Sequence, residues 1–416
     1  MVENTGITDG PAGGAAAAPK KTARPAAPAW LEEMDTVDVR QFHRSVPGYA
    51  PTPLRELKAY AEAFGVKSVL VKDESFRFGL KAFKGLGGVY AVNRVICREL
   101  GIDPAKSSLE LLQSGRYRPQ IERMVFITTT DGNHGKGVSW AAGLLGCKAY
   151  VYMPKGSVEA RAQAIRDAGR AEVFITDMNY DDCVRFTAKK AEENGWFLVQ
   201  DTSWDGYEEI PKWIMRGYTT LLFEAAEQMR ELGYDRPTHI FLQAGVGAMA
   251  GGVLGAAQSL YRDRMPVVST VEPEGVACIF ESARCGDGMP HPATGSGETI
   301  MAGLNCGEPC TLAWHILDRG ADYYFAVPDS CAARGMRVLS APMGNGRGTD
   351  PRVVSGESGA APMGLLSLLL EKESFRPFRE KLGLDENAVI LLINTEGDTD
   401  PEGYRHIVCD GAYPWE

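Results

Sequence analysis

The chain has 416 residues, of which 44% are hydrophobic and 24% are charged, as in ordinary soluble globular proteins. This length exceeds what one compact core usually holds, so we expect two folded domains. The formal net charge of −10 leaves no basic surplus to displace counterions from phosphates, which argues against sequence-independent binding of nucleic acid.

The N-terminal segment, residues 1–30, is rich in Ala, Gly and Pro, and we expect it to form a disordered tail. A signal peptide needs a basic start and then an apolar run, whereas Lys20 and Lys21 follow a short alanine run here. Later segments contain no stretch of about 18 apolar residues, which a membrane-spanning helix would need. We therefore expect a cytoplasmic protein with no membrane association.

Beyond the tail, short β-branched runs alternate with longer segments whose apolar residues recur at helical spacing. The predicted strands are Val69–Lys72, Met124–Thr128, Ala149–Met153, Val173–Thr176, Phe197–Gln200, Ile240–Gln243, Val267–Val271 and Val389–Ile393. Two predicted helical segments, Glu159–Ala168 and Tyr218–Leu232, are each followed by glycine. This alternation predicts an α/β fold with mostly parallel sheets that are covered by helices.

Three motifs follow predicted strands, at the end where parallel sheets bind ligands. They are Lys81–Gly88 (KAFKGLGG), Asp131–Gly135 (DGNHG) and Gly245–Gly252 (GVGAMAGG). The first offers an amine on a glycine-rich turn, the second offers polar groups at a helix start, and the third offers backbone N–H groups that can wrap a phosphate. Together they suggest pyridoxal phosphate, held by a lysine as a Schiff base.

The glycine loop alone is a weak signal. It also fits a tight turn that lets a helix pack closely on a strand, and its spacing differs from the dinucleotide motif G-x-G-x-x-G. Its place near the middle of the chain favours a phosphate-binding loop, because a dinucleotide motif usually follows the first strand of its domain.

Lys84 is the best candidate for the reactive amine. Phe83 and Leu86 bracket it with apolar surface, and we expect the glycines that follow it to let a flat ring approach. Burial should lower its pKa, as an amine that attacks an aldehyde needs. Lys72, in contrast, precedes two acids and is typical of a charge-paired strand end.

Nine cysteines are too few for a disulfide scaffold in a chain of this length, and the odd count leaves at least one unpaired. Cys306 and Cys310 have the spacing of half a zinc site, but no matching pair follows, so we predict no metal site. We expect reduced thiols, and a local contact between Cys278 and Cys306 stays open.

Several motifs in combination resemble one known family. They are Phe42-His43, Pro47-Gly48-Tyr49, Pro51-Thr52-Pro53-Leu54, Val71–Glu74, Arg77–Leu80, Ala82-Phe83-Lys84, Thr129–Gly135, Gln200-Asp201-Thr202, Gly356–Gly359 and Thr395–Asp400. In this order, from about residue 42 to the C-terminus, the chain is similar to the 2,3-diaminopropionate ammonia-lyase family. That family belongs to the fold type II, or tryptophan synthase β-like, pyridoxal-phosphate enzymes.

The resemblance implies two open, twisted, mostly parallel sheets flanked by helices. It also implies a large cofactor-binding domain of residues 31–91 plus 206–416, with a small mobile domain of residues 92–205 inserted. We expect the small domain to close on bound substrate. A homodimer is likewise implied by the family and not by any pattern in the sequence.

The activity implied is α,β-elimination of the D or L isomer of 2,3-diaminopropionate, or of both, to pyruvate and two ammonia. Lys84 would carry the cofactor, Asp131 would remove the α-proton of the D isomer, and Asp201 that of the L isomer. Asp131 stands where the related serine and threonine dehydratases have Ser. From the sequence alone, Asp131 could instead cap the helix that begins near Asn133, and Asp201 could be a turn residue.

Other roles are carried over from the motifs. Asn133 would bond the phenolic oxygen of the ring, and Thr395 would lie at the pyridine nitrogen. Gly132 and its neighbours would receive the substrate carboxylate, while His134 is expected to be structural and Glu357 to lie near the cofactor. The predicted cofactor-binding residues are Phe83, Lys84, Asn133, Gly245, Val246, Gly247, Ala248, Met249, Glu357 and Thr395, and the predicted substrate-binding residues are Thr130, Asp131, Gly132, Asn133 and His134.

Three alternative functions stay open. A serine or threonine dehydratase, or another β-eliminating or β-replacing enzyme, could use the same scaffold, although Asp131 argues against it. A racemase could use acids on two faces of the substrate. A nucleotide-binding or regulatory protein could use the glycine loop without any catalysis.

Overall fold

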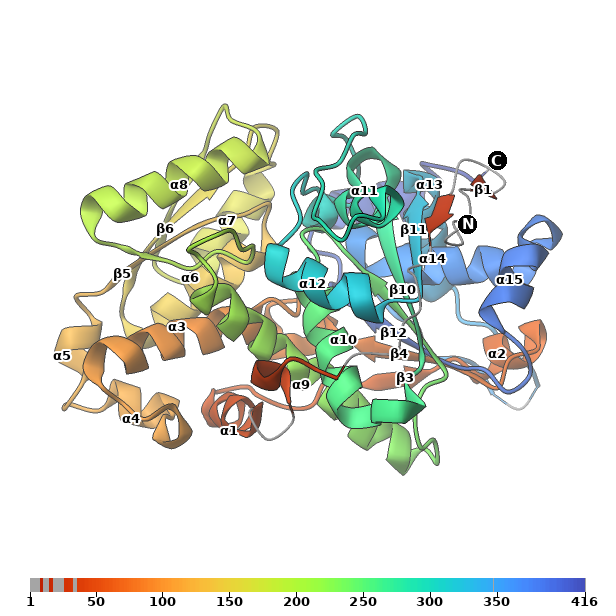
Figure 1. Cartoon of the computed structure of the whole chain (residues 1–416), viewed down its shortest axis with the longest axis horizontal. Helices are drawn as coiled ribbons and strands as arrows, with labels where there is room; N and C mark the ends of the chain where they lie inside the picture. Colours follow the sequence, from red (N-terminus) through yellow and green to blue (C-terminus); the bar gives the residue numbers. More distant parts are fainter. Residues whose placement is uncertain (1–7, 10–14, 18–25, 33–35, 347, 416) are drawn as a thin grey trace.

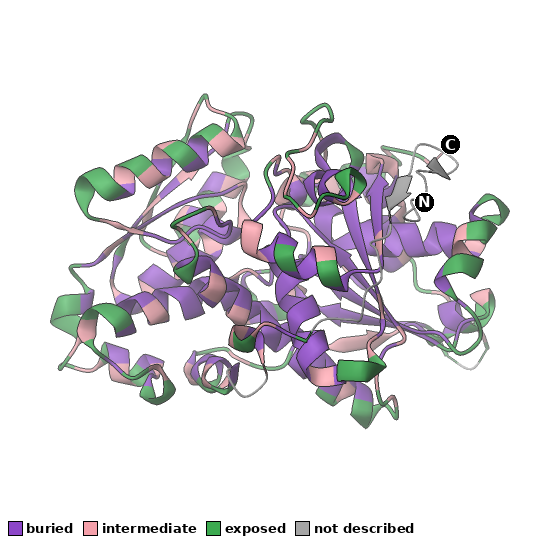
Figure 2. Ribbon diagram, viewed as in Figure 1, coloured by how far each residue is buried: buried purple, intermediate pink, exposed green. Residues whose placement is uncertain are grey.

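A computed structural model describes residues 8–9, 15–17, 26–32, 36–346 and 348–415. The described chain forms two lobes, each built on its own sheet (Figure 1). Residues of both sheets are mostly buried, and the exposed residues lie chiefly on the outer helices and loops (Figure 2). Within these ranges, no helix combines the length and apolar character needed to cross a membrane.

The larger sheet has eight strands in the order β1-β2-β11-β10-β9-β12-β4-β3. Their bounds are Thr8–Asp9 (β1), Ala15–Ala17 (β2), Leu54–Glu56 (β3), Ser68–Asp73 (β4), His239–Gln243 (β9), Val267–Pro273 (β10), Tyr323–Val327 (β11) and Val389–Asn394 (β12). The five strands from β11 to β4 are mutually parallel, while β3 and β2 pair antiparallel at the two sides of this block.

The smaller sheet is entirely parallel, with the strand order β7-β6-β5-β8. Its strands are Val125–Thr129 (β5), Lys148–Met153 (β6), Ala171–Ile175 (β7) and Phe197–Leu198 (β8), and the intervening helices are Asn133–Leu145 (α6), Glu159–Ala168 (α7) and Tyr180–Asn194 (α8). Each helix connects two parallel strands, as right-handed crossover connections require.

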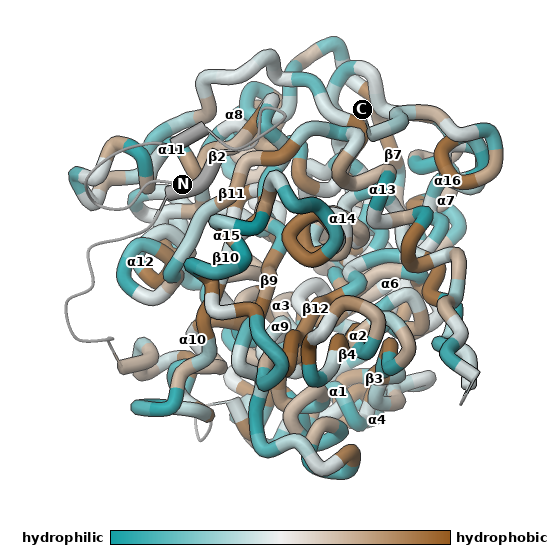
Figure 3. The backbone as a smooth tube through the Cα atoms, turned by 90° about the vertical axis from the view of Figure 1, so that its right-hand side faces the viewer, coloured by the Kyte–Doolittle hydropathy of each residue, from teal (hydrophilic) through white to brown (hydrophobic). Residues whose placement is uncertain are grey.

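Helices cover both faces of the larger sheet. The remaining α-helices are Val37–Ser45 (α1), Lys58–Phe64 (α2), Gly85–Leu100 (α3), Leu109–Gln113 (α4), Arg118–Ile121 (α5), Glu209–Glu231 (α9), Ala248–Tyr261 (α10), Cys278–Cys285 (α11), Thr311–Gly320 (α12), Asp329–Ser340 (α13), Glu357–Glu371 (α14), Arg376–Leu382 (α15) and Pro401–Val408 (α16). Strand β9 places Ile240 and Leu242 in the apolar cluster with α9 and α10, and Phe241 in the cluster with α13 and α14. Helix α14 is mostly hydrophobic, as its end-on view shows (Figure 3).

The structure confirms the predicted fold class and all eight predicted strands. The prediction for Phe197–Gln200 was too long, since only Phe197–Leu198 pairs as a strand. Helix α7 has the predicted bounds, and Tyr218–Leu232 is the C-terminal part of α9. Strands β3 and β11 were not predicted.

The predicted domain division stays a prediction. Its boundary at residue 92 falls inside α3, which runs from Gly85 to Leu100. Within the segment predicted as a tail, the structure describes the short strands β1 and β2 and a 3-10 turn at Ala29–Leu31. The rest of that segment up to residue 25 lies outside the described residues.

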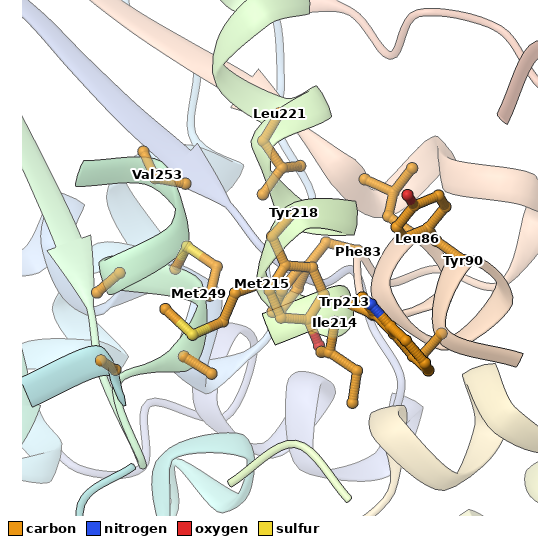
Figure 4. Close-up of a cluster of buried hydrophobic side chains, with 14 of the residues drawn as sticks. Phe83, Leu86, Tyr90, Trp213, Ile214, Met215, Tyr218, Leu221, Met249 and Val253 are labelled. Carbon is orange, nitrogen blue, oxygen red and sulfur yellow. The ribbon is translucent and has the colours of Figure 1, made fainter. Parts of the chain in front are cut away.

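Helix α3 lies between the two lobes and is held on both sides by close glycine contacts. A Cβ atom on Gly217 of α9 would lie 2.7 Å from the Cα of Gly87, and one on Gly137 of α6 would lie 3.0 Å from the carbonyl oxygen of Lys84. The apolar cluster around Phe83 and Tyr218 fills the same region (Figure 4). The expectation that the glycines after the reactive lysine admit a flat ring was therefore wrong, because they serve helix packing.

A buried ionic network supports the strand that leads to this helix. Lys72 Nζ donates to Glu224 Oε2 at 2.7 Å, and Arg77 donates to the same oxygen at 2.7 Å and to Glu74 Oε2 at 2.8 Å. The side chains of Lys72, Arg77, Glu74 and Glu224 are fully buried. The prediction that Lys72 is charge-paired is confirmed, although its partner comes from α9.

We expect Glu224→Gln to lower the free energy of unfolding by about 3 kcal/mol or more, because it leaves two buried cations without their shared partner. The pKa of Glu224 is lowered to about 2: burial opposes its ionisation, but the charges of Arg77 and Lys72 outweigh that effect. Its stabilisation is therefore present above its ordinary pKa of 4.5 and is lost as the pH falls towards 2. Urea denaturation at neutral pH measures the change.

The matched control is Glu227→Gln, one helical turn further along α9. Glu227 pairs with Arg40 at 2.6 Å, but its side chain is 47% exposed. Loss of such a pair changes the stability by about 1 kcal/mol or less. Equal changes in the free energy of unfolding for the two substitutions would show that the buried network contributes no more than an exposed ion pair.

Candidate active site

Lys84 directly precedes α3, in a turn whose backbone is attached to the end of β12. The N–H of Phe83 donates to the carbonyl of Thr395 at 3.1 Å, and the N–H of Gly397 donates to the carbonyl of Lys81 at 2.9 Å. This attachment places the amine of Lys84 at the carboxyl end of the larger sheet.

The amine of Lys84 is paired with a carboxylate from the other lobe. Its Nζ donates to Oδ2 of Asp201 at 2.7 Å, and the Asp201 side chain is only 4% exposed. Burial opposes the charge of Lys84, but Asp201, with smaller contributions from Cys306 and Asp131, outweighs that effect, and the pKa of Lys84 is raised. The expectation of a lowered pKa was wrong for this reason. Asp201 is likewise not a simple turn residue.

The inner cavity lies between the glycine loop, α9 and the end of β12. It is lined by Phe83, Lys84, Asn133, Asp201, Tyr218, Gln243, Ala244, Gly245, Val246, Gly247, Ala248, Met249, Gly303, Leu304, Cys306, Ser358, Thr395 and Glu396. All predicted cofactor-binding residues except Glu357 are among them. Phe83 packs against Tyr218 with ring centroids 4.8 Å apart (Figure 4), and Met249 lines the same cavity.

The inner cavity fits a flat, phosphorylated ring. Among the described residues, the N–H groups of Gly245, Val246 and Gly247 have no acceptor, and they precede the N-terminus of α10. The hydroxyl of Tyr218 and Oε1 of Gln243 are buried and have no hydrogen-bond partner within the described ranges of the chain. Such groups carry an energetic cost unless a ligand satisfies them, and a phosphorylated pyridine supplies the acceptors that the N–H groups need.

The middle cavity adjoins the inner cavity at Lys84. It is lined by Lys84, Thr130, Asp131, Gly132, Asn133, His134, Lys136, Arg161, Ala164, Ile165, Tyr180, Gly303, Glu396 and Thr399. It therefore brings together all predicted substrate-binding residues. Lys84 borders both cavities, so its amine lies where a ligand in one could react with a ligand in the other.

Asp131 lies in the middle cavity and does not cap α6. The N-cap residue is Gly132, at φ 156°, and the side chain that bonds the first turn is that of Thr130, whose Oγ1 accepts from the N–H of Gly135 at 2.9 Å. Burial raises the pKa of Asp131 to about 7, although the positive charges of Lys84 and Arg161 oppose the rise. A carboxyl group that is half ionised near neutral pH is suited to proton transfer.

Asp201 differs from Asp131 in its electrostatic environment. Burial opposes ionisation of Asp201, but the charges of His134 and Lys84 outweigh that effect, and the pKa of Asp201 is lowered. His134 itself bonds the carbonyl of Val199 through Nε2 at 2.7 Å, and its structural role stays a prediction. The site thus holds two carboxyl groups with opposite pKa shifts.

The remaining predicted residues occupy varied places. Nδ2 of Asn133 donates to Oε2 of Glu396 at 2.6 Å, and Oγ1 of Thr395 accepts from Gln243 at 2.9 Å. Glu357 lies instead on the outer cleft, a larger opening between the lobes that also contains Asp131. The outer cleft is lined by Asp131, Pro154, Lys155, Gly156, Ser157, Val158, Arg161, Asn179, Tyr180, Asp181, Val276, Gly297, Thr299, Ile300, Ala302, Asn305, Gly307, Glu357, Asp400, Gly403, His406, Ile407 and Tyr413.

Several residues of the site were missed by the sequence analysis. Glu396 borders both smaller cavities and lies within a motif from which only Thr395 was taken. Arg161 lies within a predicted helix that gave no sign of function. Cys306 lines the inner cavity, and both Cys306 and Cys278 are free thiols, as expected.

Comparison with known proteins agrees with this geometry. Residues 46–381 match the model of a family described as pyridoxal-phosphate dependent enzyme. The fold is that of this class. The chain belongs to the pyridoxal-phosphate-dependent enzyme family.

The relatives that establish the narrower family are bacterial. The chain is 51% identical to diaminopropionate ammonia-lyase of Escherichia coli strain K12 over 374 residues, which is 90% of this chain and 91% of the relative. It is 48% identical to the Salmonella typhimurium protein of that name, over 90% of this chain and 92% of the relative. Within its class, the chain therefore belongs to the diaminopropionate ammonia-lyase family.

Solved structures of the E. coli protein show the same fold. The selenomethionine-containing holo form superimposes with a TM-score of 0.89 at 47% identity, covering 98% of this chain and 99% of the other. A complex of that protein with an aminoacrylate-PLP azomethine reaction intermediate has a TM-score of 0.88 and covers 98% of this chain and 100% of the other.

We expect Gly247→Ala to weaken pyridoxal phosphate binding about tenfold or more. Gly247 has φ +90°, where a side chain is strained, and its Cβ atom would lie 3.0 Å from Ile279 Cδ1. The substitution would therefore displace the N–H groups of the glycine loop. Titration of the apoprotein with pyridoxal phosphate, followed by visible absorbance, measures the dissociation constant.

Gly233→Ala is the control, because Gly233 has φ +85° but no atom within 4 Å of the added Cβ. It carries the same backbone strain away from the cavity and should leave cofactor affinity unchanged. Equal affinities of the Gly247 variant and the parent protein would contradict the phosphate role of the loop.

Proposed function

We propose that this protein catalyses the α,β-elimination of 2,3-diaminopropionate, which with one water gives pyruvate and two ammonia. The observation that carries the proposal is the arrangement of Lys84 between two carboxyl groups, Asp131 in the middle cavity and Asp201 in the inner cavity. The names of the close relatives support the same substrate.

The residues of the inner cavity would hold the cofactor. The N–H groups of Gly245 to Ala248 would bind its phosphate, Phe83 and Met249 would contact its ring, and Thr395 would lie at its pyridine nitrogen. When bound, pyridoxal phosphate would link to the substrate amine and draw electrons from the α-carbon, which acidifies the α-hydrogen. Lys84 would carry the cofactor between turnovers.

The residues of the middle cavity would hold the substrate and move its protons. Thr130, Gly132 and Asn133, at the N-terminus of α6, would orient the carboxylate of the amino acid. Asp131 would take the α-proton of the D isomer, and Asp201 that of the L isomer. The Nζ of Lys84, which shares a hydrogen bond with Asp201, would supply a proton to the departing β-amine.

Further organisation is proposed from the family resemblance. Residues 92–205 would act as the small domain and close on the substrate, while residues 31–91 plus 206–416 would form the cofactor domain. The chain would form a homodimer and work in the cytoplasm. Light scattering of the purified protein tests the dimer.

Substitution of the two acids tests the proposed function. We expect Asp131→Asn to lower kcat/KM for the D isomer by about 10²-fold to 10⁴-fold, since an amide cannot accept the α-proton, while the L isomer loses much less. Asp201→Asn should affect the L isomer more than the D isomer. The measurement is pyruvate release from each isomer.

Parallel assays with D-serine and L-serine provide the control for the dehydratase alternative. The parent protein should release pyruvate faster from diaminopropionate than from either serine. Faster release from serine would identify a dehydratase, and unchanged rates with both Asn variants would overturn the assignment of the bases.

The two isomers should also differ in pH dependence. Asp131 acts as a base only when ionised, so its raised pKa predicts that log kcat/KM for the D isomer falls with slope one below about pH 7. Asp201 has a lowered pKa, so the corresponding limb for the L isomer should lie at lower pH. The amines of the two isomers have the same pKa values. Their titration therefore cancels when kcat/KM for the D isomer is divided by kcat/KM for the L isomer. Coincident pH profiles would contradict separate bases.

A further inference from the structure

Arg161 is a half-buried cation at the mouth of the site, and it has no anionic partner within the part of the chain that the structure describes. It lies in the first turn of α7 and borders both the middle cavity and the outer cleft. Among the described residues, no side chain forms a hydrogen bond or an ion pair with its guanidinium. Arg166, on the same helix, pairs with Glu159 and donates to the carbonyl of Val173.

The side chain of Arg161 runs along the loop that precedes α6. A Cβ atom on Gly132 would lie 3.5 Å from Cδ of Arg161, so the arginine stem occupies the space beside this glycine. A side chain at residue 132 would also be strained, because φ is 156° there. The guanidinium is thereby placed next to the N-terminus of α6, where the N–H groups already favour an anion.

The charges around Arg161 come from both lobes. Burial raises the pKa values of Asp131, on the smaller lobe, and Glu357, at the start of α14, and the positive charge of Arg161 opposes both shifts. The charge of Lys84 also lowers the pKa of Asp131, and the charges of Asp201 and Asp181 raise it. Neither Asp131 nor Glu357 contacts the guanidinium closely enough to form an ion pair with it, so Arg161 retains its full capacity for an incoming carboxylate.

We propose that Arg161 binds the α-carboxylate of the amino-acid substrate, together with the N-terminus of α6. The inference rests on the proposed function, which places an amino acid in the middle cavity. A planar guanidinium binds a carboxylate through two parallel N–H···O bonds, which an ammonium cannot match. Because both isomers carry the same carboxylate, Arg161 serves both and fixes the α-carbon between the two bases.

The test compares ligands with and without a carboxylate. The holoenzyme is titrated with D-serine and with ethane-1,2-diamine, and binding is followed by the visible absorbance of the cofactor. We expect Arg161→Gln to raise the dissociation constant of D-serine 10-fold to 100-fold and that of ethane-1,2-diamine less than 2-fold. Arg161→Lys should lose less affinity for D-serine than the Gln variant, because it keeps the charge.

Arg166→Gln is the matched control, since it removes a cation from the same helix outside the site, and it should bind both ligands like the parent. Equal losses for the two ligands, or no loss for D-serine in either Arg161 variant, would overturn the proposal. The titration requires no turnover. If the parent failed to eliminate ammonia from diaminopropionate while the ligand contrast held, the proposed function would fall and the carboxylate site would stand.

Kinetics give a second measurement. Arg161→Gln should raise KM for both isomers of diaminopropionate by similar factors and change kcat by less than 3-fold, because the carboxylate contact is the same before and during proton transfer. A change in KM or kcat for one isomer only would show instead that Arg161 acts through one of the bases. That result would overturn the proposal.

Discussion

The contact between Lys84 and Asp201 is the interaction on which the site depends. It spans 2.7 Å and joins the turn before α3 to the segment that follows the smaller sheet. A buried amine or carboxylate is costly alone, so each group stabilises the charged form of the other. Asp131, in the adjoining cavity, lacks so close a partner, and its pKa rises to about 7. Two acids in one site thus acquire different protonation states from their surroundings alone.

The architecture holds this contact rigidly from the side of the larger lobe. Backbone hydrogen bonds attach the turn of Lys84 to the end of β12, and the close approach of Gly87 and Gly217 fixes α3 against α9. The buried network around Glu224 anchors the strand that leads to the turn. Asp131, in the loop before α6, and Asn133, the first residue of α6, belong in contrast to the smaller lobe. Motion of the lobes would therefore move these two groups relative to a fixed amine.

The sequence predicted the parts of the structure that depend on residues adjacent in the chain. Buried parallel strands such as Val389–Asn394 are continuous apolar runs, and the glycine loop needs a positive φ at Gly247, so both leave a clear pattern in the chain. Strand β3 has only three residues and lies at an edge of the sheet, so it leaves almost no pattern in the sequence. The role that we propose for Lys84 rests on its neighbours in the motif.

Properties that arise from distant partners were not predictable in this way. The pKa of Lys84 is raised by a residue 117 positions later in the chain, so burial alone gave the wrong direction. The glycines of α3 face Gly217 and Gly137, which no local pattern could show. Arg161 and Glu396 become site residues only because the fold brings α7 and the end of β12 to the same cavity.

The most direct test of the account is the position of the covalent attachment. The yellow holoenzyme is reduced with borohydride and digested, and the labelled peptide is sequenced by mass spectrometry. The account predicts the reduced pyridoxyl group on Lys84 and a loss of visible absorbance in a Lys84→Ala variant. Lys136 also borders the middle cavity, and its pKa is lowered by burial. A label on Lys136, or on any lysine other than Lys84, would contradict the account.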